Sequence, residues 1–314
     1  MNFLITGGSG FVGTWVMREL LQSDHHVVVY DLQPQPERWH RVIGERAARI
    51  QYEAGNLTDP AALEGVFRQH AITNVIHLGA LLTPACQADP FLGCEVNIMG
   101  SVAVWEAVRK YHDQIQGFAY ASSFAALGDP TADIPPLPSV AAQDEFRTPT
   151  FYGMFKRAVE MLAGQYWLHH GIASVGFRPF IIYGPGRVDG LTAGPSIACG
   201  AAVRGERYTI GYRGSAGYDY IEDVASAFVR GACDTPTGAH VCDFPSLTAT
   251  PEDFIQQIDH CVPGAADLLI AAGPQLPRHT HRYPCDLRTL FADWEPTSLA
   301  EGVRRTVDYE QARL

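Results

Sequence analysis

The sequence predicts a doubly wound α/β fold, in which helices cover both faces of a parallel sheet, followed by a smaller lobe. Short apolar runs typical of strands, such as residues 2–6 and 26–31, alternate with amphipathic stretches typical of helices, such as 14–23 and 60–69. Strands and helices that alternate at this rhythm form parallel sheets that are buried on both faces. A glycine-rich loop between the first strand and the first helix supports the same fold class.

The expected elements follow one another in a regular order. We expect strands at 2–6, 26–31, 49–55, 74–80, 117–123 and 174–184, and helices at 14–23, 60–69, 95–111 and 151–171. Residues 129–150 are rich in proline and acidic side chains, so they predict a long irregular loop of a kind that is often functional.

The second half of the chain has a looser pattern, which predicts a division into two domains. Residues 1–184 form the first domain, and residues 185–314 form a smaller substrate-binding lobe. A helix at 222–230 and a strand at 239–244 predict that the chain returns to the main sheet near residues 220–245.

The composition is that of an ordinary globular protein of 314 residues, with 46% hydrophobic and 18% charged residues. Its net charge of −11 argues against a nucleic-acid partner, which would require a basic face. The seven cysteines include no Cys-x-x-Cys pair, so we expect reduced, mostly buried thiols. The histidine pairs at 169–170 and 279–281 lack further ligands at zinc spacing, and no metal is expected.

The sequence also bears on location. No apolar run approaches the ~18 residues that a membrane helix requires, and the first six residues lead directly into the glycine loop, without room for a secretion leader. We therefore expect a cytoplasmic protein without a membrane partner.

The glycine loop reads TGGSGFVG and places Gly7, Gly10 and Gly13 between a strand and a helix. The first glycine permits a tight turn, the second lets a pyrophosphate approach the backbone, and the third lets the helix pack on the strand. Free N–H groups at the helix start bind the phosphates, so Phe11 and Val12 are expected to contact the cofactor as well. This context predicts a Rossmann dinucleotide site.

Asp31 ends the second strand, 18 residues after Gly13. An acid at this position accepts hydrogen bonds from the hydroxyls of the adenosine ribose. Its charge would repel a 2′-phosphate, and the stretch LQPQPE that follows supplies no adjacent arginine. We therefore expect NAD rather than NADP.

Tyr152 and Lys156 lie four residues apart, and so on one face of a helix. Tyrosine has an unperturbed pKa of about 10 and is a poor base near neutral pH unless a cation favours its phenolate. Lys156 supplies that cation and could also bind the nicotinamide ribose. Ser122 and Ser123 end a strand, where they can either bind a substrate oxygen or cap a turn.

In this order the motifs resemble the extended short-chain dehydrogenases/reductases, the NAD-dependent epimerase/dehydratase family. The resemblance covers nearly the whole chain. It also rests on GNLTD at 55–59, HLGA at 77–80, Asn97 within VNIMGS, RPFIIYGPG at 178–186 and YIEDVASAF at 220–228.

The resemblance implies a role for individual residues. Tyr152 is the expected general acid/base, Lys156 its activator, and Ser123 the hydrogen-bond donor to the substrate oxygen. Further expected cofactor contacts are Asn56, Leu57, Leu78, Gly79, Ala80, Asn97 and Tyr183. Expected substrate contacts are Ser122, Phe124, Arg187, Arg213 and Tyr218.

Two departures from the family pattern bear on the substrate. Sugar-nucleotide dehydratases of this family carry an Asp-Glu pair where this chain has Phe124 and Ala125, which argues against dehydration. Tyr218 stands where nucleotide-sugar epimerases usually carry an arginine for the diphosphate, and a second family arginine has no clear match. These differences favour a small carbohydrate-like or hydroxy-acid substrate.

The expected activity is therefore NAD-dependent hydride transfer at a secondary alcohol or ketone carbon. The alternative is a nucleotide-sugar 4-epimerase with tightly bound NAD. A non-catalytic NAD-binding sensor is least favoured, because Tyr152 and Lys156 are both present. The resemblance further implies a homodimer, in which the helices that carry Asn97 and Tyr152 pair.

Overall fold

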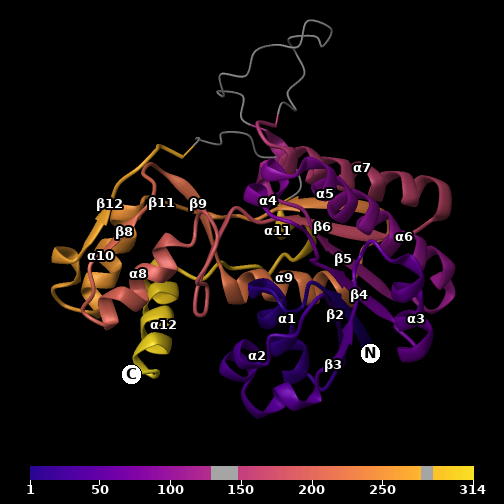
Figure 1. The fold of residues 1–314 in the computed structure, drawn as a ribbon, viewed down its shortest axis with the longest axis horizontal. Helices are drawn as coiled ribbons and strands as arrows, with labels where there is room; N and C mark the ends of the chain where they lie inside the picture. Colours follow the sequence, from indigo (N-terminus) through magenta and orange to yellow (C-terminus); the bar gives the residue numbers. More distant parts are fainter. Residues whose placement is uncertain (129–147, 277–285) are drawn as a thin grey trace, which may run out of the picture.

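The computed structural model describes residues 1–128, 148–276 and 286–314. A seven-stranded sheet, parallel throughout, forms the centre of the larger domain (Figure 1). Its strands, in spatial order, are β10 (Ala239–Asp243), β6 (Ser174–Arg178), β5 (Gly117–Ala121), β4 (Asn74–His77), β1 (Asn2–Thr6), β2 (His26–Asp31) and β3 (Gln51–Ala54). The strand order reverses beside β1, and in such sheets a ligand crevice opens at that point.

Helices cover both faces of the sheet, which confirms the predicted doubly wound fold. On one face α1 (Phe11–Gln22) packs against α9 (Ile221–Cys233). On the other face lie α3 (Pro60–His70), α6 (Gly100–Lys110) and α7 (Phe151–His170). Neighbouring residues of β1 point to opposite faces, as in any strand, so Ile5 belongs to the first core and Leu4 to the second.

A continuous helical segment runs from Pro90 to Lys110, through α5 (Pro90–Cys94), the π-helical turn η2 (Glu95–Met99) and α6. Contrary to the sequence expectation, this segment is long and apolar enough to cross a membrane by length and composition alone. Half of its most apolar stretch is buried inside the protein, as in the core helix of a globular domain. Shorter elements nearby are α2 (Pro36–Ile43), η1 (Gly44–Arg49), α4 (Thr83–Ala88), η3 (His112–Gln114) and η4 (Phe124–Leu127).

The smaller lobe contains two small sheets. Strands β11 (Leu247–Ala249), β9 (Ala216–Tyr220) and β7 (Ile181–Tyr183) form one, and β12 (Leu269–Ala271) pairs with β8 (Tyr208–Ile210) in the other. Helices α8 (Gly194–Val203), α10 (Pro251–Cys261) and α12 (Leu299–Gln311) pack together beside them (Figure 1). The short element η5 (Ala265–Asp267) lies in the lobe, whereas α11 (Leu287–Leu290) follows Asp286, which pairs with Asp243 at the end of β10 in the main sheet.

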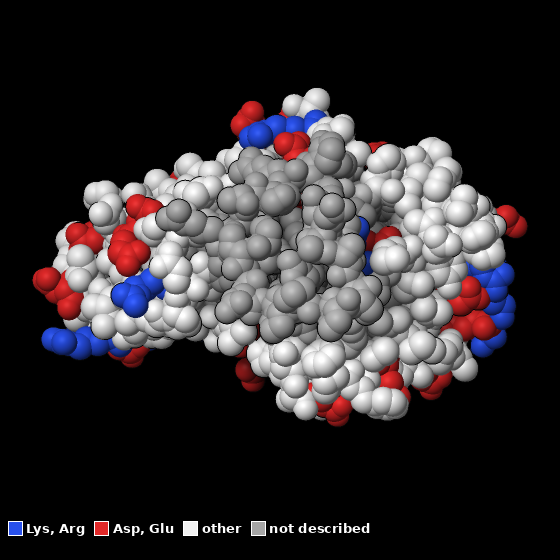
Figure 2. Space-filling view, turned by 90° about the horizontal axis from the view of Figure 1, so that it is seen from above, with Lys and Arg blue, Asp and Glu red and all other residues white. Residues whose placement is uncertain are grey.

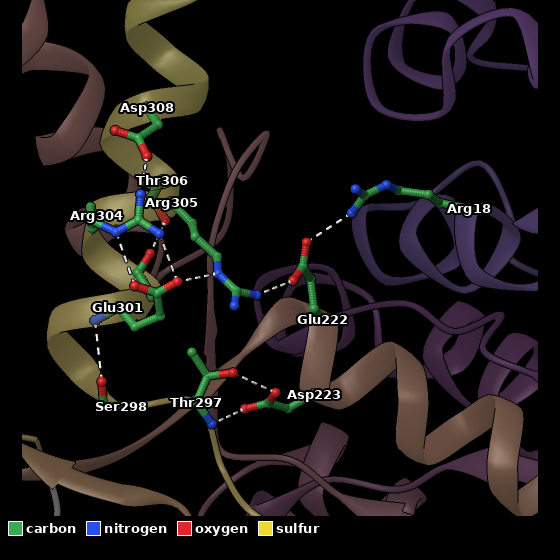
Figure 3. Close-up of polar contacts among 11 residues, drawn as sticks. Arg18, Glu222, Asp223, Thr297, Ser298, Glu301, Arg304, Arg305, Thr306 and Asp308 are labelled. Atoms are coloured by element: carbon green, nitrogen blue, oxygen red, sulfur yellow. Dashed lines mark hydrogen bonds and ion pairs between the residues drawn. The ribbon is translucent and has the colours of Figure 1, made fainter.

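The start of α9 joins the two parts of the molecule (Figure 3). Glu222 pairs with Arg18 of α1 at 2.8 Å and with Arg305 of α12 at 2.6 Å. The adjacent Asp223 accepts hydrogen bonds from the main-chain N–H and the hydroxyl of Thr297, at 2.8 and 2.7 Å. The ion pairs are partly exposed, and such pairs contribute at most about 1 kcal/mol each.

Two sequence expectations need comment here. Cys86, Cys94, Cys199, Cys233 and Cys261 are free thiols, but Cys242 is disulfide-bonded, so the prediction of seven reduced cysteines is wrong for that residue. Most of the predicted irregular loop at 129–150 lies outside the described residues.

Candidate functional site

The glycine loop connects β1 to α1, and its backbone leaves no room for side chains. Gly7 has φ +71°, and a Cβ atom there would lie 2.6 Å from the main-chain nitrogen of Gly79. A Cβ atom at Gly13 would lie 2.5 Å from the Cα of Gly8. Both positions therefore require glycine, as the predicted turn does.

The start of α1 is open to an anion. Gly10 is its N-cap, and within the described chain no side chain caps it and no acidic residue lies in the first turn. The first N–H groups of a helix have no partner within the helix and carry a partial positive charge. The N–H groups of Phe11 and Val12 lie in this turn, so the site fits a pyrophosphate.

The loop after β4 lies against the glycine loop, on the side where the cofactor is expected. The N–H of Leu78 donates to the Thr6 carbonyl at 3.0 Å, and the N–H of Gly79 donates to the Thr6 hydroxyl at 3.3 Å. Leu57 is buried against Gly79, and Ala80 follows in the same loop. The structure therefore places the predicted residues of this loop directly beside the glycine loop.

Buried hydrogen bonds link His77, directly before this loop, to β1 and α6. His77 contacts the Thr6 hydroxyl at 2.6 Å and the Ser101 hydroxyl at 3.0 Å, and Ser101 donates to the carbonyl of Asn97 at 2.6 Å. Burial, together with the nearby charge of Lys156, lowers the pKa of His77 to about 3. The imidazole is therefore neutral near pH 7.

Asp31 lies at the end of β2, beside the glycine loop. Its carboxylate accepts the N–H of Ser9 at 3.0 Å and that of Leu32 at 2.8 Å. The carboxylate thus fixes the loop, and it keeps lone pairs available for ribose hydroxyls. Asn56 is exposed nearby, and the Tyr30 hydroxyl donates to its carbonyl at 2.9 Å.

Helix α7 carries the predicted catalytic pair and is well defined at both ends. The Thr150 hydroxyl caps its start by accepting the N–H of Gly153 at 3.0 Å, and Gly171 ends it in the left-handed region at φ +66°. A Cβ atom at Gly153 would lie 2.5 Å from the carbonyl oxygen of Ala125. Glycine after Tyr152 therefore lets the helix approach the turn that follows β5.

Three consecutive residues at the end of β5 hold three positions of α7, each one helical turn from the next. The carbonyl of Ala121 accepts the Lys156 ammonium at 2.6 Å. The Ser122 hydroxyl donates to the Glu160 carboxylate at 2.5 Å. The Ser123 hydroxyl forms a hydrogen bond with Tyr152. We call these three contacts the β5 clasp.

The electrostatics of the pair differ in part from the sequence expectation. Burial raises the pKa of Tyr152 to about 12, although the hydrogen bond from Ser123 opposes this rise. Burial also lowers the pKa of Lys156 to about 8, against the opposing effects of Cys86 and Glu160. Lys156 Nζ lies 5.8 Å from the centroid of the Tyr152 ring. Desolvation is thus the largest influence on the pKa of Tyr152.

Asn97 and Ser122 are placed differently from their predicted roles. Both groups of the Asn97 amide bind the main chain of Leu81, at 2.7 and 2.9 Å, so Asn97 holds the loop instead of presenting its amide to the cofactor. Ser122 is 3% exposed and directs its hydroxyl to Glu160. The prediction that Ser122 contacts substrate is therefore not supported, and Ser123 is the serine beside Tyr152.

Two predicted tyrosine contacts lie in the core of the lobe. Tyr183 packs against Tyr218 and Phe254, and its hydroxyl lies against Gly302 of α12. Tyr218 is likewise buried, with its hydroxyl 3.2 Å from that of Tyr212. Aromatic packing encloses both rings, so the structure does not support a nicotinamide contact through the Tyr183 side chain or a substrate contact through that of Tyr218.

The two predicted arginine contacts bind main-chain oxygens. Arg187 donates to the Ile182 carbonyl and, at 3.0 Å, to the Thr192 hydroxyl. Arg213 is exposed and donates to the carbonyl of Gly273 at 3.1 Å. Neither arrangement places a guanidinium beside Tyr152. Phe124 directly follows Ser123 and stacks on Phe180, with ring centroids 4.6 Å apart.

The sequence analysis missed three charged residues near the site. Glu160 and Arg178 form a buried ion pair at 2.6 Å, and Glu160 lies one helical turn after Lys156 of the predicted catalytic pair. Arg38 of α2 donates to the carbonyl of Ser9 in the glycine loop at 3.0 Å, although the stretch after Asp31 offered no arginine. The one available signal was the spacing of Glu160, four residues after Lys156.

Fold and site together define a short-chain dehydrogenase/reductase of the extended type. The chain belongs to the NAD dependent epimerase/dehydratase family, whose model matches residues 3–239. NAD is the cofactor of that family, and the glycine loop, the open start of α1 and Asp31 fit it.

Several known proteins are similar to this chain. D-erythronate dehydrogenase from Cupriavidus necator is 34% identical over 178 residues, which are 53% of this chain and 50% of that relative. A UDP-glucose 4-epimerase from Erwinia amylovora is 30% identical over 169 residues, 53% of this chain and 48% of the relative. The chain thus aligns with about half the length of these curated relatives.

Two solved structures share the fold over nearly their whole lengths. UDP-glucose 4-epimerase from Thermus thermophilus, in complex with NAD, has a TM-score of 0.77 and 23% identity, with 100% of both chains covered. A partial consensus L-threonine 3-dehydrogenase has a TM-score of 0.80 and 22% identity, covering 99% of this chain and 100% of that one.

Proposed function

We propose that this protein is an NAD-dependent oxidoreductase that transfers hydride at a secondary alcohol or ketone carbon of a small carbohydrate-like substrate, such as a sugar acid. One observation carries the proposal: Ser123, Tyr152 and Lys156 converge at the end of β5. The charge of Lys156 also reaches His77, directly before the loop that lines the cofactor crevice.

In this proposal each residue moves or holds a proton. Bound NAD supplies the hydride acceptor for the carbinol carbon. Tyr152 takes the proton of the substrate hydroxyl, while the Ser123 hydroxyl donates a hydrogen bond to the substrate oxygen. Lys156 provides the positive charge that favours the Tyr152 phenolate, since an opposite charge lowers the pKa of an acid. Reduction of a ketone uses the same groups in reverse.

The positions of three residues in the lobe favour a substrate that has no diphosphate group. Tyr218, which replaces the arginine expected on a diphosphate, lies in the lobe core, and Arg187 and Arg213 bind main-chain carbonyls. A diphosphate is usually held by arginine forks or lysine charges. The similarity to a D-erythronate dehydrogenase points the same way, toward a small hydroxy acid.

The second candidate is a nucleotide-sugar 4-epimerase, which the similarity to UDP-glucose 4-epimerases favours. An epimerase uses the same proton transfer but returns the hydride to the other face of the sugar. It therefore turns over with catalytic NAD and no net reduction.

The first experiment follows the absorbance of reduced nicotinamide with D-erythronate and related sugar acids, and product inversion with UDP-glucose. We expect NADH to accumulate with a sugar acid and no inversion of UDP-glucose. Inversion with catalytic NAD and no net reduction would replace this proposal by the epimerase.

Tyr152→Phe should lower kcat by roughly 10²–10⁴-fold, the usual contribution of a general acid/base. The matched control is Tyr166→Phe on the same helix, because the Tyr166 hydroxyl bonds Glu106 at 2.9 Å, away from the site. Full turnover by Tyr152→Phe would exclude the catalytic role of Tyr152, whereas binding of NAD without turnover of any substrate by the wild-type protein would favour the NAD-binding sensor.

We also propose a homodimer that pairs through α5, η2 and α7. Phe91, Met99, Met161 and Leu168 are large apolar side chains on these elements, and each is exposed by 59% or more. Met154, Met161 and Leu168 follow one another at intervals of seven residues and so line one stripe of α7. Contiguous exposed apolar side chains of this kind mark association surfaces.

We further propose a cytoplasmic enzyme that binds neither nucleic acid nor membranes. The net charge of −11 supports the absence of nucleic-acid binding. On the face shown in Figure 2, Lys and Arg of the described residues form small separate groups, accompanied by acidic residues. Such a face lacks the basic stripe that phosphate backbones require.

A further inference from the structure

We propose that Glu160 is a positioning residue for the reaction: its carboxylate, fixed by Ser122 and Arg178, keeps Lys156 charged and aligned beneath Tyr152. This inference rests on the proposed function. It assigns a role to a buried acid that touches neither Tyr152 nor the cofactor crevice.

The placement of Glu160 relative to Lys156 supports this role. Glu160 lies four residues after Lys156 on α7, so both side chains are on the same face of the helix. Both residues are 6% exposed, and water therefore screens their interaction weakly. The carboxylate favours the ammonium form of Lys156 and opposes the effect of burial.

Several hydrogen bonds hold the Glu160 carboxylate in a fixed orientation. Arg178 binds it with a two-pronged fork, Nε to Oε1 at 2.6 Å and Nη2 to Oε2 at 2.7 Å. Ser122 adds a bond to Oε1 at 2.5 Å, and Arg157 one to Oε2 at 2.8 Å. Forked, charge-assisted bonds of this kind fix geometry as well as charge.

The partners of the Glu160 carboxylate connect α7 to the main sheet. Arg178 ends β6 and also contacts Asp243 at the end of β10, at 3.2 Å. Ser122 follows β5 and lies between Ala121, which binds Lys156, and Ser123, which binds Tyr152. The Glu160 carboxylate therefore ties α7 to the ends of three strands at the level of the proton-transfer groups.

The design of a test depends on which other groups surround the two residues. Among the described residues, the titratable and charged groups that interact with Lys156 or Glu160 are His77, Cys86, Tyr120, Tyr152, Arg157 and Arg178, and Asp243 acts on Arg178. Glu160 is the carboxylate among them that acts directly on Lys156.

The sequence offers a direct measurement, because the chain contains two lysines, Lys110 and Lys156. In protein labelled with ¹³C at the lysine side chains, NMR should follow both ammonium groups separately against pH, without a substrate. We expect Glu160→Gln to lower the titration midpoint of Lys156 by about one pH unit, the usual effect of losing an adjacent opposite charge.

The matched control is Glu64→Gln. Glu64 pairs with Lys110 at 2.6 Å, so its replacement removes a carboxylate partner from the other lysine. This variant should leave the Lys156 midpoint unchanged. Glu160→Asp, which keeps the charge, should retain most of the wild-type midpoint.

A second variant covers the case in which Glu160→Gln does not fold, since it leaves Arg178 with a neutral partner. The double replacement Glu160→Met with Arg178→Met removes both charges of the pair, and such exchanges are often neutral for stability. Removal of the Arg178 cation alone raises the Lys156 midpoint, so the effect of Glu160 is read by comparing the double variant with Arg178→Met, and the double variant should have the lower midpoint. An unchanged midpoint in folded Glu160→Gln, or equal midpoints in the double variant and Arg178→Met, overturns the proposal, whereas absence of NADH formation by wild-type protein would instead contradict the proposed function.

Discussion

At Lys156 the proposed catalytic role and the stability of the fold oppose each other. Its pKa is lowered from 10.5 to about 8 by burial, so the folded chain holds this proton less tightly than the unfolded chain. Between those two pH values the unfolded state binds more protons, and stability rises with pH. Below pH 8 the full cost of burying the ammonium is present.

We expect Lys156→Met to stabilise the protein at pH 7 while abolishing turnover. A methionine of similar length removes the buried charge, and the free energy of unfolding should rise by about 1–3 kcal/mol, the range that a pKa shift of this size allows. Urea unfolding at pH 7 and at pH 10.5 measures the effect, which should vanish at the higher pH. Lys110→Met, at an exposed site, should change little, and a destabilised Lys156→Met at pH 7 would contradict this account.

Sequence alone predicted which residues of a specific catalytic motif lie together. It did not predict the surroundings of residues whose side chains suit several roles. The structure brings Ser123 and Tyr152 together as predicted, because they stand on a strand end and a helix whose order defines the fold. Tyr183 and Tyr218 carry equally useful hydroxyls, yet aromatic neighbours distant in sequence bury them. When segments distant in sequence bury a residue, the residues next to it in the sequence show no pattern that would predict the burial.

At the scale of elements, the distance between α7 and the turn after β5 depends on one glycine. A Cβ atom at Gly153 would meet the Ala125 carbonyl at 2.5 Å, a contact with backbone that cannot move aside. The helix would have to shift, and Tyr152 would move with it.

Gly153→Ala should therefore lower kcat by about 100-fold, the effect of a displacement near 1 Å, although the protein still folds. Gly164→Ala on the same helix is the control, because nothing lies within 4 Å of a Cβ atom there. That control should keep its activity and gain up to about 1 kcal/mol in stability, since alanine favours helix. Equal activity of the two variants would show that the approach of α7 is not critical.

Elements of the main sheet were easier to predict than those of the lobe. Apolar runs such as 26–31 are buried on both faces and are recognisable by composition. The lobe strands β7, β8, β11 and β12 have three residues each, too few to show a period, and they pair with partners far along the chain. The π-helical turn at Asn97 likewise has no simple sequence signal.

At the scale of the whole molecule, the apolar stripe on α7 has a consequence for assembly. We expect Met161→Glu to convert a dimer into a monomer, because it places a charge within the proposed contact. Light scattering after size-exclusion chromatography at micromolar concentration measures the change. Ile270→Glu, at another exposed apolar residue on β12, should leave the assembly unchanged. A wild-type monomer would exclude the proposed homodimer.

The β5 clasp has an evolutionary consequence. All three of its contacts, and the ion pair of Glu160 with Arg178, come from β5, β6 and α7, which precede the lobe in the chain. Helix α9 and β10 stay with the main sheet, so the lobe consists of two segments, one before Ile221 and one after Asp243. Recombination or drift within those two segments would therefore leave the proposed proton-transfer residues in place.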